Sequence, residues 1–242
     1  MDYNLLNNEF SSNSEDDDDD ETTSSLKKYI EPKILENINL NSYFSQSDIQ
    51  RSNNKLKITN KGVYSISKPD DAEWITNIIC NFIMFHTNYD TKLFTITDAT
   101  AGIGGNTISF ARRFFSVNAI EINSVHYDVL KNNIHSLGLE NVKLFHDNFL
   151  TFIENNKLKS EIFFLDPPWG GKSYKKFKYF NLKLGKIPIY NIINILFDKS
   201  YKYVILKGPI NLNVSPIINY SKYDNFQIYK NMRGNMLLMI FY

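Results

Sequence analysis

The chain has 242 residues, of which 43% are hydrophobic and 14% aromatic, with 27 Lys and Arg against 26 Asp and Glu. This length and composition indicate a folded globular protein of one sizeable domain with appendages. The single cysteine, Cys80, excludes a disulfide framework and a zinc–cysteine cluster. Because there is no apolar run of about 18 residues and no signal-peptide pattern, we expect an intracellular protein of the nucleus or cytoplasm, neither secreted nor membrane-bound.

Charge is unevenly distributed along the chain. Residues 1–25 contain nine acidic and no basic residues, which leaves 27 basic and 17 acidic residues from Leu26 onward. We expect residues 1–25 to be a disordered acidic tail, because this Ser-, Asn- and Asp-rich stretch cannot bury enough apolar surface to fold. The basic body predicts an anionic partner, with RNA the obvious candidate. The tail either keeps the protein soluble or competes with RNA for the basic surface.

Residues 26–69 predict an N-terminal extension that packs on the following domain. Scattered apolar positions indicate short helical pieces up to residue 60, and residues 61–69 predict a turn or short extended segment.

Residues 70–242 predict a single α/β domain in which helical and strand patterns alternate. The predicted helices span 70–87, 106–115, 124–137, 149–157 and 190–198, and the predicted strands span 93–98, 117–122, 142–146, 162–165 and 203–206. A basic, aromatic insertion occupies 172–186, and 225–229 with 236–242 predict an antiparallel hairpin. This order predicts a mostly parallel sheet that is covered on both faces and closed by the hairpin.

A glycine-rich turn, Asp98-Ala99-Thr100-Ala101-Gly102-Ile103-Gly104-Gly105-Asn106, follows the first of these strands. Its glycines allow a ligand to approach the backbone, and the helix that follows supplies free amide donors. The second strand ends near Glu121, where a carboxylate can accept both hydroxyls of a ribose. Asp147 and Asn148 follow the third strand, where a carboxylate can accept from an adenine amino group. Taken singly, each acid is equally consistent with a solvated loop.

Three acids at the ends of three successive strands fit a nucleoside that has a charged amino-acid tail and no phosphates. S-adenosylmethionine is such a molecule, and we therefore predict it as the cofactor. The glycine turn alone is weaker, because a tight turn between strand and helix also explains it.

The fourth strand is followed by Asp166-Pro167-Pro168-Trp169-Gly170-Gly171. Each proline fixes φ and removes a donor, so this loop is rigid and ends the strand. Methylation of an exocyclic amino group needs acceptors for its hydrogens and a fixed base plane. Asp166 and the carbonyl of Pro167 can be those acceptors, and Trp169 can stack on the base. The alternative is a rigid surface turn with a packing tryptophan.

The cofactor turn through Ala111 and the Pro-Pro-Trp-Gly-Gly motif resemble those of the trimethylguanosine synthases, which methylate N2 of the 7-methylguanosine cap of RNA. The resemblance covers roughly residues 55–242. It implies a Rossmann-like class I S-adenosylmethionine-dependent methyltransferase fold and a tryptophan, Trp169, stacked on the 7-methylguanine. It also implies that Asn106 belongs to the wall shared by cofactor and cap, with Ser65 and Ser67 near both.

The strand-end pattern and the resemblance together give a set of expected site residues. For the cofactor these are Ser67, Asp98, Ala99, Gly102, Gly104, Asn106, Glu121, Ile122, Asp147, Asn148 and Asp166. For the acceptor they are Ser65, Asn106, Trp169, Lys172 and Lys207, and the expected catalytic residues are Asp166, Pro167 and Trp169. No metal is expected.

Two departures from the family pattern affect the acceptor site. Asp166 stands where the family has serine, as in amino-methyltransferases that act on adenine or on guanine within RNA. The family also places an arginine after a strand-end proline to hold the cap phosphates, whereas this chain has Pro209-Ile210. Lysine could supply that charge, from Lys207 or from the insertion (Lys172, Lys175 and Lys176).

The sequence therefore predicts an RNA cap guanine-N2 methyltransferase, acting as a monomer on 7-methylguanosine-capped RNA without metal or membrane. One alternative is an amino-methyltransferase that acts on a base within RNA or DNA, at guanine N2 or adenine N6. A second alternative is a non-catalytic cap- or RNA-binding protein that retains the fold.

Overall fold

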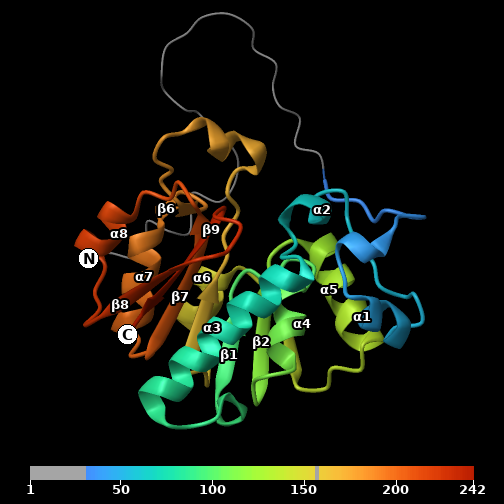
Figure 1. Ribbon diagram of the computed structural model, residues 1–242, viewed down its shortest axis with the longest axis horizontal. Helices are drawn as coiled ribbons and strands as arrows, with labels where there is room; N and C mark the ends of the chain where they lie inside the picture. Colours follow the sequence, from blue (N-terminus) through green and yellow to red (C-terminus); the bar gives the residue numbers. More distant parts are fainter. Residues whose placement is uncertain (1–30, 156–157) are drawn as a thin grey trace, which may run out of the picture. The chain divides into compact units, whose positions relative to one another are not determined.

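A seven-stranded sheet with the order β3-β2-β1-β4-β7-β9-β8 forms the centre of the fold (Figure 1). The computed structural model describes residues 31–155 and 158–242, so the predicted acidic tail lies outside the described residues. The strands are β1 (Thr95–Asp98), β2 (Ser116–Glu121), β3 (Val142–His146), β4 (Ile162–Leu165), β7 (Tyr203–Pro209), β8 (Phe226–Lys230) and β9 (Met236–Phe241). A separate two-stranded sheet pairs β5 (Lys183–Leu184) with β6 (Ile187–Pro188).

The predicted mostly parallel sheet with a C-terminal antiparallel hairpin is confirmed. Strands β1, β2, β3, β4 and β7 pair in parallel, whereas β9 runs antiparallel to both β7 and β8. The carboxyl ends of the five parallel strands therefore share one edge of the sheet, which is where open α/β folds bind ligands.

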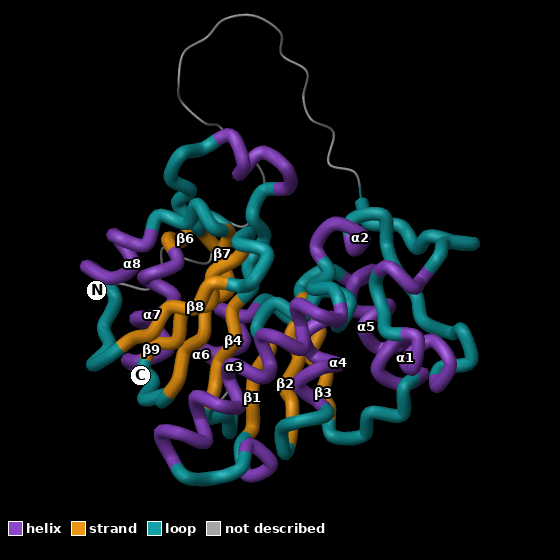
Figure 2. Tube along the Cα trace, in the orientation of Figure 1, coloured by secondary structure: helices purple, strands orange, loops and turns teal. Residues whose placement is uncertain are grey.

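Helices cover both faces of the sheet, as Figure 2 also shows. The helices are α1 (Gln46–Arg51), α2 (Gly62–Ser65), α3 (Pro69–Thr87), α4 (Gly105–Ala111), α5 (Ser124–Ser136), α6 (Phe149–Asn155), α7 (Ile189–Asp198) and α8 (Val214–Tyr220). Apolar side chains of α3 and α4 pack on one face, and those of α6, α7 and α8 pack on the other. In β4, Ile162 and Phe164 face the first layer while Phe163 and Leu165 face the second, which explains its unbroken apolar sequence.

The described part of the N-terminal extension packs beside α4 and α5. Phe44, Ile49 and Leu56 are buried in one cluster with Ile108 of α4 and Leu130 of α5. The short helical pieces expected here are α1 and the 3₁₀ turn η2 (Leu40–Ser42).

Several element boundaries differ from the predictions for local reasons. The helix predicted to reach residue 115 ends at Ala111, and the amides of Arg113 and Phe114 both donate to the carbonyl of Phe110 in a turn that precedes β2. The segment predicted as a turn or extended contains one helical turn, α2. The sequence pattern missed α8, since Pro216 interrupts it; a proline is tolerated there because it lies in the first turn.

Candidate active site at the carboxyl ends of the strands

Buried carboxylates gather at the edge where the parallel strands end. Asp98 ends β1 and is 1% exposed, and Glu121 ends the neighbouring β2 and is 8% exposed. Asp166 directly follows β4, on the other side of β1. Since carboxylates are rarely buried without partners, the contacts of each decide what this edge can bind.

Asp98 has one oxygen satisfied and one without a partner. The hydroxyl of Thr107 on α4 donates to Oδ2 at 2.6 Å, whereas Oδ1 is buried and has no hydrogen-bond partner. Burial, with a smaller contribution from the nearby negative charge of Asp166, raises the pKa of Asp98 to about 7. An orphaned acceptor of this kind indicates that a donor of a ligand completes the site.

The glycine-rich turn is shaped by two steric requirements. Gly104, which directly precedes α4, has a φ of 105°, a backbone angle that residues with a side chain rarely adopt. A Cβ at Gly105 would lie 2.6 Å from the backbone oxygen of Ser67, so only glycine lets that segment pass over the start of α4. This close approach brings the buried Ser67 to the site. Ser65 is exposed at the end of α2, where its hydroxyl contacts the carbonyl of Lys61, away from the carboxylates.

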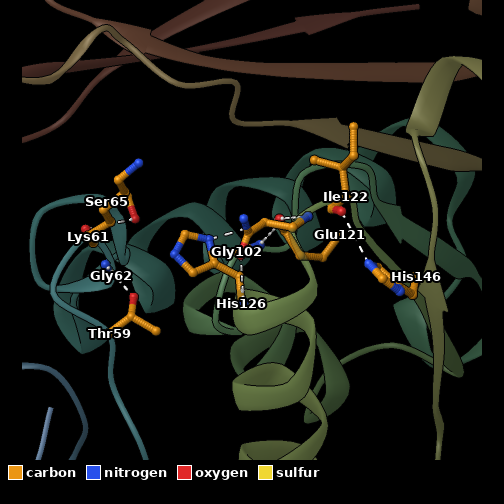
Figure 3. Close-up of polar contacts among 10 residues, drawn as sticks. Thr59, Lys61, Gly62, Ser65, Gly102, Glu121, Ile122, His126 and His146 are labelled. Atoms are coloured by element: carbon orange, nitrogen blue, oxygen red, sulfur yellow. Dashed lines mark hydrogen bonds and ion pairs between the residues drawn. The ribbon is translucent and has the colours of Figure 1, made fainter. Parts of the chain in front are cut away.

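Glu121 is held by backbone amides on both oxygens, as Figure 3 shows. The amide of Gly102 donates to Oε2 and that of Asn123 to Oε1, each at 2.8 Å. Burial raises the pKa of Glu121, and these two donors oppose that rise. Ile122 is 60% exposed and points away from the other side chains in the figure.

His126 on α5 also belongs to this site, although the sequence analysis did not predict it. Its Nδ1 lies 3.9 Å from Oε1 of Glu121, and its Nε2 is buried without a partner. Burial lowers the pKa of His126 and the positive charge of Lys61 adds to that effect. The only signal for it in the sequence is its position in the first turn of α5, the helix that follows Glu121.

Asp147 and Asn148 follow β3 and begin α6. The amide of Asn148 donates to Oδ1 of Asp147 at 2.7 Å, and Oδ1 of Asn148 accepts from the amide of Leu150 at 2.9 Å. Asn148 therefore acts as an N-terminal cap of the helix. Asp147 is only half-buried at this position.

The carboxylate of Asp166 forms a buried ion pair that the sequence reading did not predict. Nζ of Lys207 on β7 lies 2.6 Å from Oδ2 of Asp166 and donates to the hydroxyl of Ser67 at 2.7 Å. Lys207 is 6% exposed. Its expected role at the cap phosphates requires a surface cation, whereas the structure places this ammonium inside the protein beside Asp166.

Two further contacts fix Asp166. Nδ2 of Asn106 donates to the same Oδ2 at 3.3 Å, and Asp166 donates its own amide to the hydroxyl of Thr100 at 3.0 Å. Oδ1 of Asn106 is buried without a partner. Asn106 therefore links the loop of residues 166–171, called the acceptor loop below, to the start of α4. Its Oδ1 remains available to accept a hydrogen bond.

Trp169 lies half-buried between the apolar layers on the two faces of the sheet. Its ring centroid is 5.3 Å from that of Tyr174 and 5.4 Å from Nζ of Lys207. Its Nε1 is buried and has no partner.

Three other expected residues have plainer positions. Pro167 is buried beside Asp166, and Ala99, 2% exposed, donates its amide to the carbonyl of Phe164 and so ties β1 to β4. Lys172 belongs to the 3₁₀ helix η4 (Gly171–Lys176), and its side chain lies outside what the structure describes.

Comparison with known proteins identifies the family. A family model described as RNA cap guanine-N2 methyltransferase matches residues 94–237, which include both the glycine turn and the acceptor loop. The chain belongs to the RNA cap guanine-N2 methyltransferase family.

Two relatives of the chain differ in how much is known of them. An uncharacterized protein, L320, of Acanthamoeba polyphaga mimivirus is 36% identical over 174 residues, covering 65% of this chain and 68% of that protein. The trimethylguanosine synthase of Schizosaccharomyces pombe is 27% identical over 141 residues, covering 54% of this chain and 56% of the yeast enzyme. The chain thus matches little more than half of the characterised relative.

The fold is that of class I S-adenosylmethionine-dependent methyltransferases. A solved precorrin-6y C5,15-methyltransferase from Geobacter metallireducens superposes with a TM-score of 0.52 at 13% identity, over 74% of this chain and 90% of that structure. At this identity the likeness shows the fold alone.

The residues present at the strand ends fit S-adenosylmethionine, the cofactor of this family. The unpartnered, buried Oδ1 atoms of Asp98 and Asn106 are acceptors that can take donors of the cofactor. Within residues 31–155 and 158–242, no cluster of three or more His, Cys, Asp or Glu could hold a metal ion. No helix in the same ranges is long and apolar enough to cross a membrane.

Proposed function

We propose that this protein transfers a methyl group from S-adenosylmethionine to N2 of the 7-methylguanosine cap of RNA. The observation that carries the proposal is the position of Asp166, which lies near Asp98 at the shared strand edge and is followed in the same loop by Trp169, in a chain of the cap guanine-N2 family. The methyl donor and the acceptor base would therefore bind at adjacent sites.

The cofactor would be held by residues at the ends of the first three strands and by Asn106 of α4. Oδ1 of Asp98 and Oδ1 of Asn106 would accept hydrogen bonds that the protein does not supply. Glu121 would accept the ribose hydroxyls, since each carboxylate oxygen retains a lone pair beside its amide donor. Asp147 would accept from the adenine amino group, and the exposed Ile122 offers apolar surface to its ring.

The cofactor supplies a sulfonium methyl, which is already a good electrophile, so the protein's task is to position the acceptor. Trp169 would stack on the 7-methylguanine and hold its plane. Because that ring is cationic, stacking on indole adds a cation–π contribution of about 0.5–2 kcal/mol. Asp166 and the carbonyl of Pro167 would accept the hydrogens of N2.

The transfer then balances without a metal or a redox partner. The bond from sulfur to the methyl carbon breaks as the bond from N2 to that carbon forms, and the sulfonium becomes a thioether. N2 gives up one proton, which would pass from the hydrogen bond with Asp166 to water.

The RNA partner would be met by the basic insertion that follows the acceptor loop. Lys175 and Lys176 are exposed on η4, close in sequence to Trp169, and no acidic residue occurs between Asp166 and Asp198. Since Lys207 is paired inside the protein, we assign the cap phosphates to Lys172, Lys175 and Lys176.

A second candidate acceptor is a neutral base within RNA or DNA. It is favoured by Nζ of Lys207, a positive charge 5.4 Å from the ring of Trp169, which would repel a cationic base more than a neutral one. The carboxylate of Asp166 lies closer to that ammonium, at 2.6 Å, and offsets its charge. For this reason we rank the cap first.

The test is a comparison of acceptors with labelled S-adenosylmethionine. The purified protein is offered 7-methyl-GTP, GTP and uncapped RNA, and each product is read by mass. We expect transfer to 7-methyl-GTP, at one or two methyl groups on N2. Transfer only to GTP or uncapped RNA would establish the second candidate, and transfer to none would leave a binding protein.

A further inference from the structure

Lys207 is a buried cation of the acceptor site, and the sheet register explains its position. Leu165 of β4 pairs with Leu206 of β7 in the parallel ladder, so the next residues, Asp166 and Lys207, are neighbours on the same face. Nζ of Lys207 reaches Oδ2 of Asp166 at 2.6 Å and the hydroxyl of Ser67 at 2.7 Å. Only 6% of Lys207 is exposed.

Three donors from three separate elements converge on one oxygen of Asp166. Besides Lys207, Nδ2 of Asn106 lies 3.3 Å from Oδ2 and the hydroxyl of Ser67 lies 3.5 Å from it. Within the described residues, Oδ1 of Asp166 accepts no hydrogen bond. The carboxylate is therefore fixed through Oδ2, and Oδ1 is left to meet an incoming donor.

The two charges also depend on each other. A buried ammonium or carboxylate is costly when it is alone, and removing one partner of such a pair leaves the other uncompensated. Replacing both partners by uncharged groups is much better tolerated. Lys207 in addition lies 5.4 Å from the ring of Trp169, so it contacts both groups that the acceptor base would meet.

We propose that Lys207 is a positioning residue for methyl transfer, which clamps Oδ2 of Asp166 and thereby aims Oδ1 at the amino group of the acceptor. This inference rests on the proposed function, because it needs an amino acceptor stacked at Trp169. It also explains why an aspartate can stand where the trimethylguanosine synthases have serine: the lysine compensates the charge that aspartate brings.

The test compares two variants, Lys207→Met and the double variant Asp166→Ser/Lys207→Met. For Lys207→Met we expect kcat on 7-methyl-GTP to fall by about 10- to 100-fold, because the carboxylate loses its fixed orientation. Affinity for S-adenosylmethionine, measured by calorimetry, should stay within about twofold of wild type. The double variant should recover most of the lost kcat, since a serine hydroxyl needs no cation.

Lys202→Met is the matched control, since this exposed lysine lies just before β7 and should leave kcat unchanged. A merely structural role of Lys207 predicts that Lys207→Met loses activity only through unfolding, so that its kcat per folded molecule, with the folded fraction taken from urea unfolding, equals that of wild type; that result would overturn the inference alone. If wild type turns over GTP or uncapped RNA instead, the same variants are measured on that acceptor. A wild-type protein that methylates none of the three acceptors would overturn the proposed function and the role of Lys207 with it.

Discussion

The buried carboxylate of Asp98 makes the stability of the cofactor-free protein depend on pH. Burial raises the pKa of Asp98 from 3.8 to about 7, so between these values the native state holds a proton that the unfolded chain has lost. The stability that this proton contributes is fully present below about pH 4 and is lost as the pH rises through 7. A shift of three units corresponds to an upper limit of about 4 kcal/mol.

Asp98→Asn tests this directly, because asparagine has nearly the same shape and does not titrate. We expect the free energy of unfolding of wild type to fall relative to the variant between about pH 4 and 7, and the difference to level off above that. Urea unfolding at several pH values measures both. Glu121, whose pKa burial also raises, is present in both proteins, so the comparison reports the loss of Asp98 together with its repulsion by Glu121. Parallel pH curves would contradict the assigned state of Asp98.

Substitutions at Trp169 can distinguish an effect on acceptor binding from an effect on cofactor binding. Trp169→Ala should raise KM for 7-methyl-GTP by about 2- to 30-fold through loss of the cation–π contribution to stacking. Affinity for S-adenosylmethionine should change little. Because the ring also packs on both apolar layers, Trp169→Phe is the control that keeps most of the packing and part of the stack. Loss of cofactor affinity in the phenylalanine variant would mean that Trp169 supports the fold rather than the acceptor.

Among the elements, the sequence patterns predicted those whose periodicity or composition is strong. The apolar run of β4 and the long helix α3 are clear signals, and Asp98 and Glu121 lie at the ends of β1 and β2, where the strand patterns stop. The ion pair of Lys207 was not predictable, because it depends on which strand lies beside β4 and in what register. The same holds for Ser67, which reaches the site through a close contact with Gly105 that no spacing reveals.

The insertion supports a prediction at the scale of an element. Asn211, which follows β7, donates to the carbonyls of Tyr174 and Phe177 at 2.9 and 2.8 Å, and so fixes η4 beside the acceptor loop. Lys175→Glu/Lys176→Glu should therefore raise KM for both 7-methyl-GTP and capped RNA, with kcat unchanged. The salt dependence of RNA affinity should also weaken, because about two phosphate contacts are lost.

The matched control for the insertion is Lys131→Glu/Lys143→Glu, which makes the same change of charge on α5 and β3. It should affect neither acceptor. If the insertion variant binds 7-methyl-GTP normally and loses affinity only for capped RNA, the lysines contact the RNA body instead of the cap phosphates. Unchanged KM for both acceptors would remove the insertion from the acceptor site.

For the whole molecule, the separation of charge along the chain is the remaining feature that bears on RNA. From Leu26 onward the chain has a net charge of +10, whereas residues 1–25 carry nine acids and no bases. Residues 32–242 form one structural unit. Deleting residues 1–25 should therefore leave the unfolding midpoint unchanged while increasing affinity for RNA at low salt, if the tail competes for the basic surface.

The size of that gain should depend on ionic strength. Exposed charges act over a Debye length of about 10 Å at 0.1 M salt and about 3 Å at 1 M, so the difference between the full chain and the truncated chain should vanish at high salt. A variant in which the nine acids are replaced by Asn and Gln keeps the length of the tail, and it should match the truncated chain in affinity. Equal RNA affinity of all three proteins at low salt would show that the tail does not occupy the basic surface.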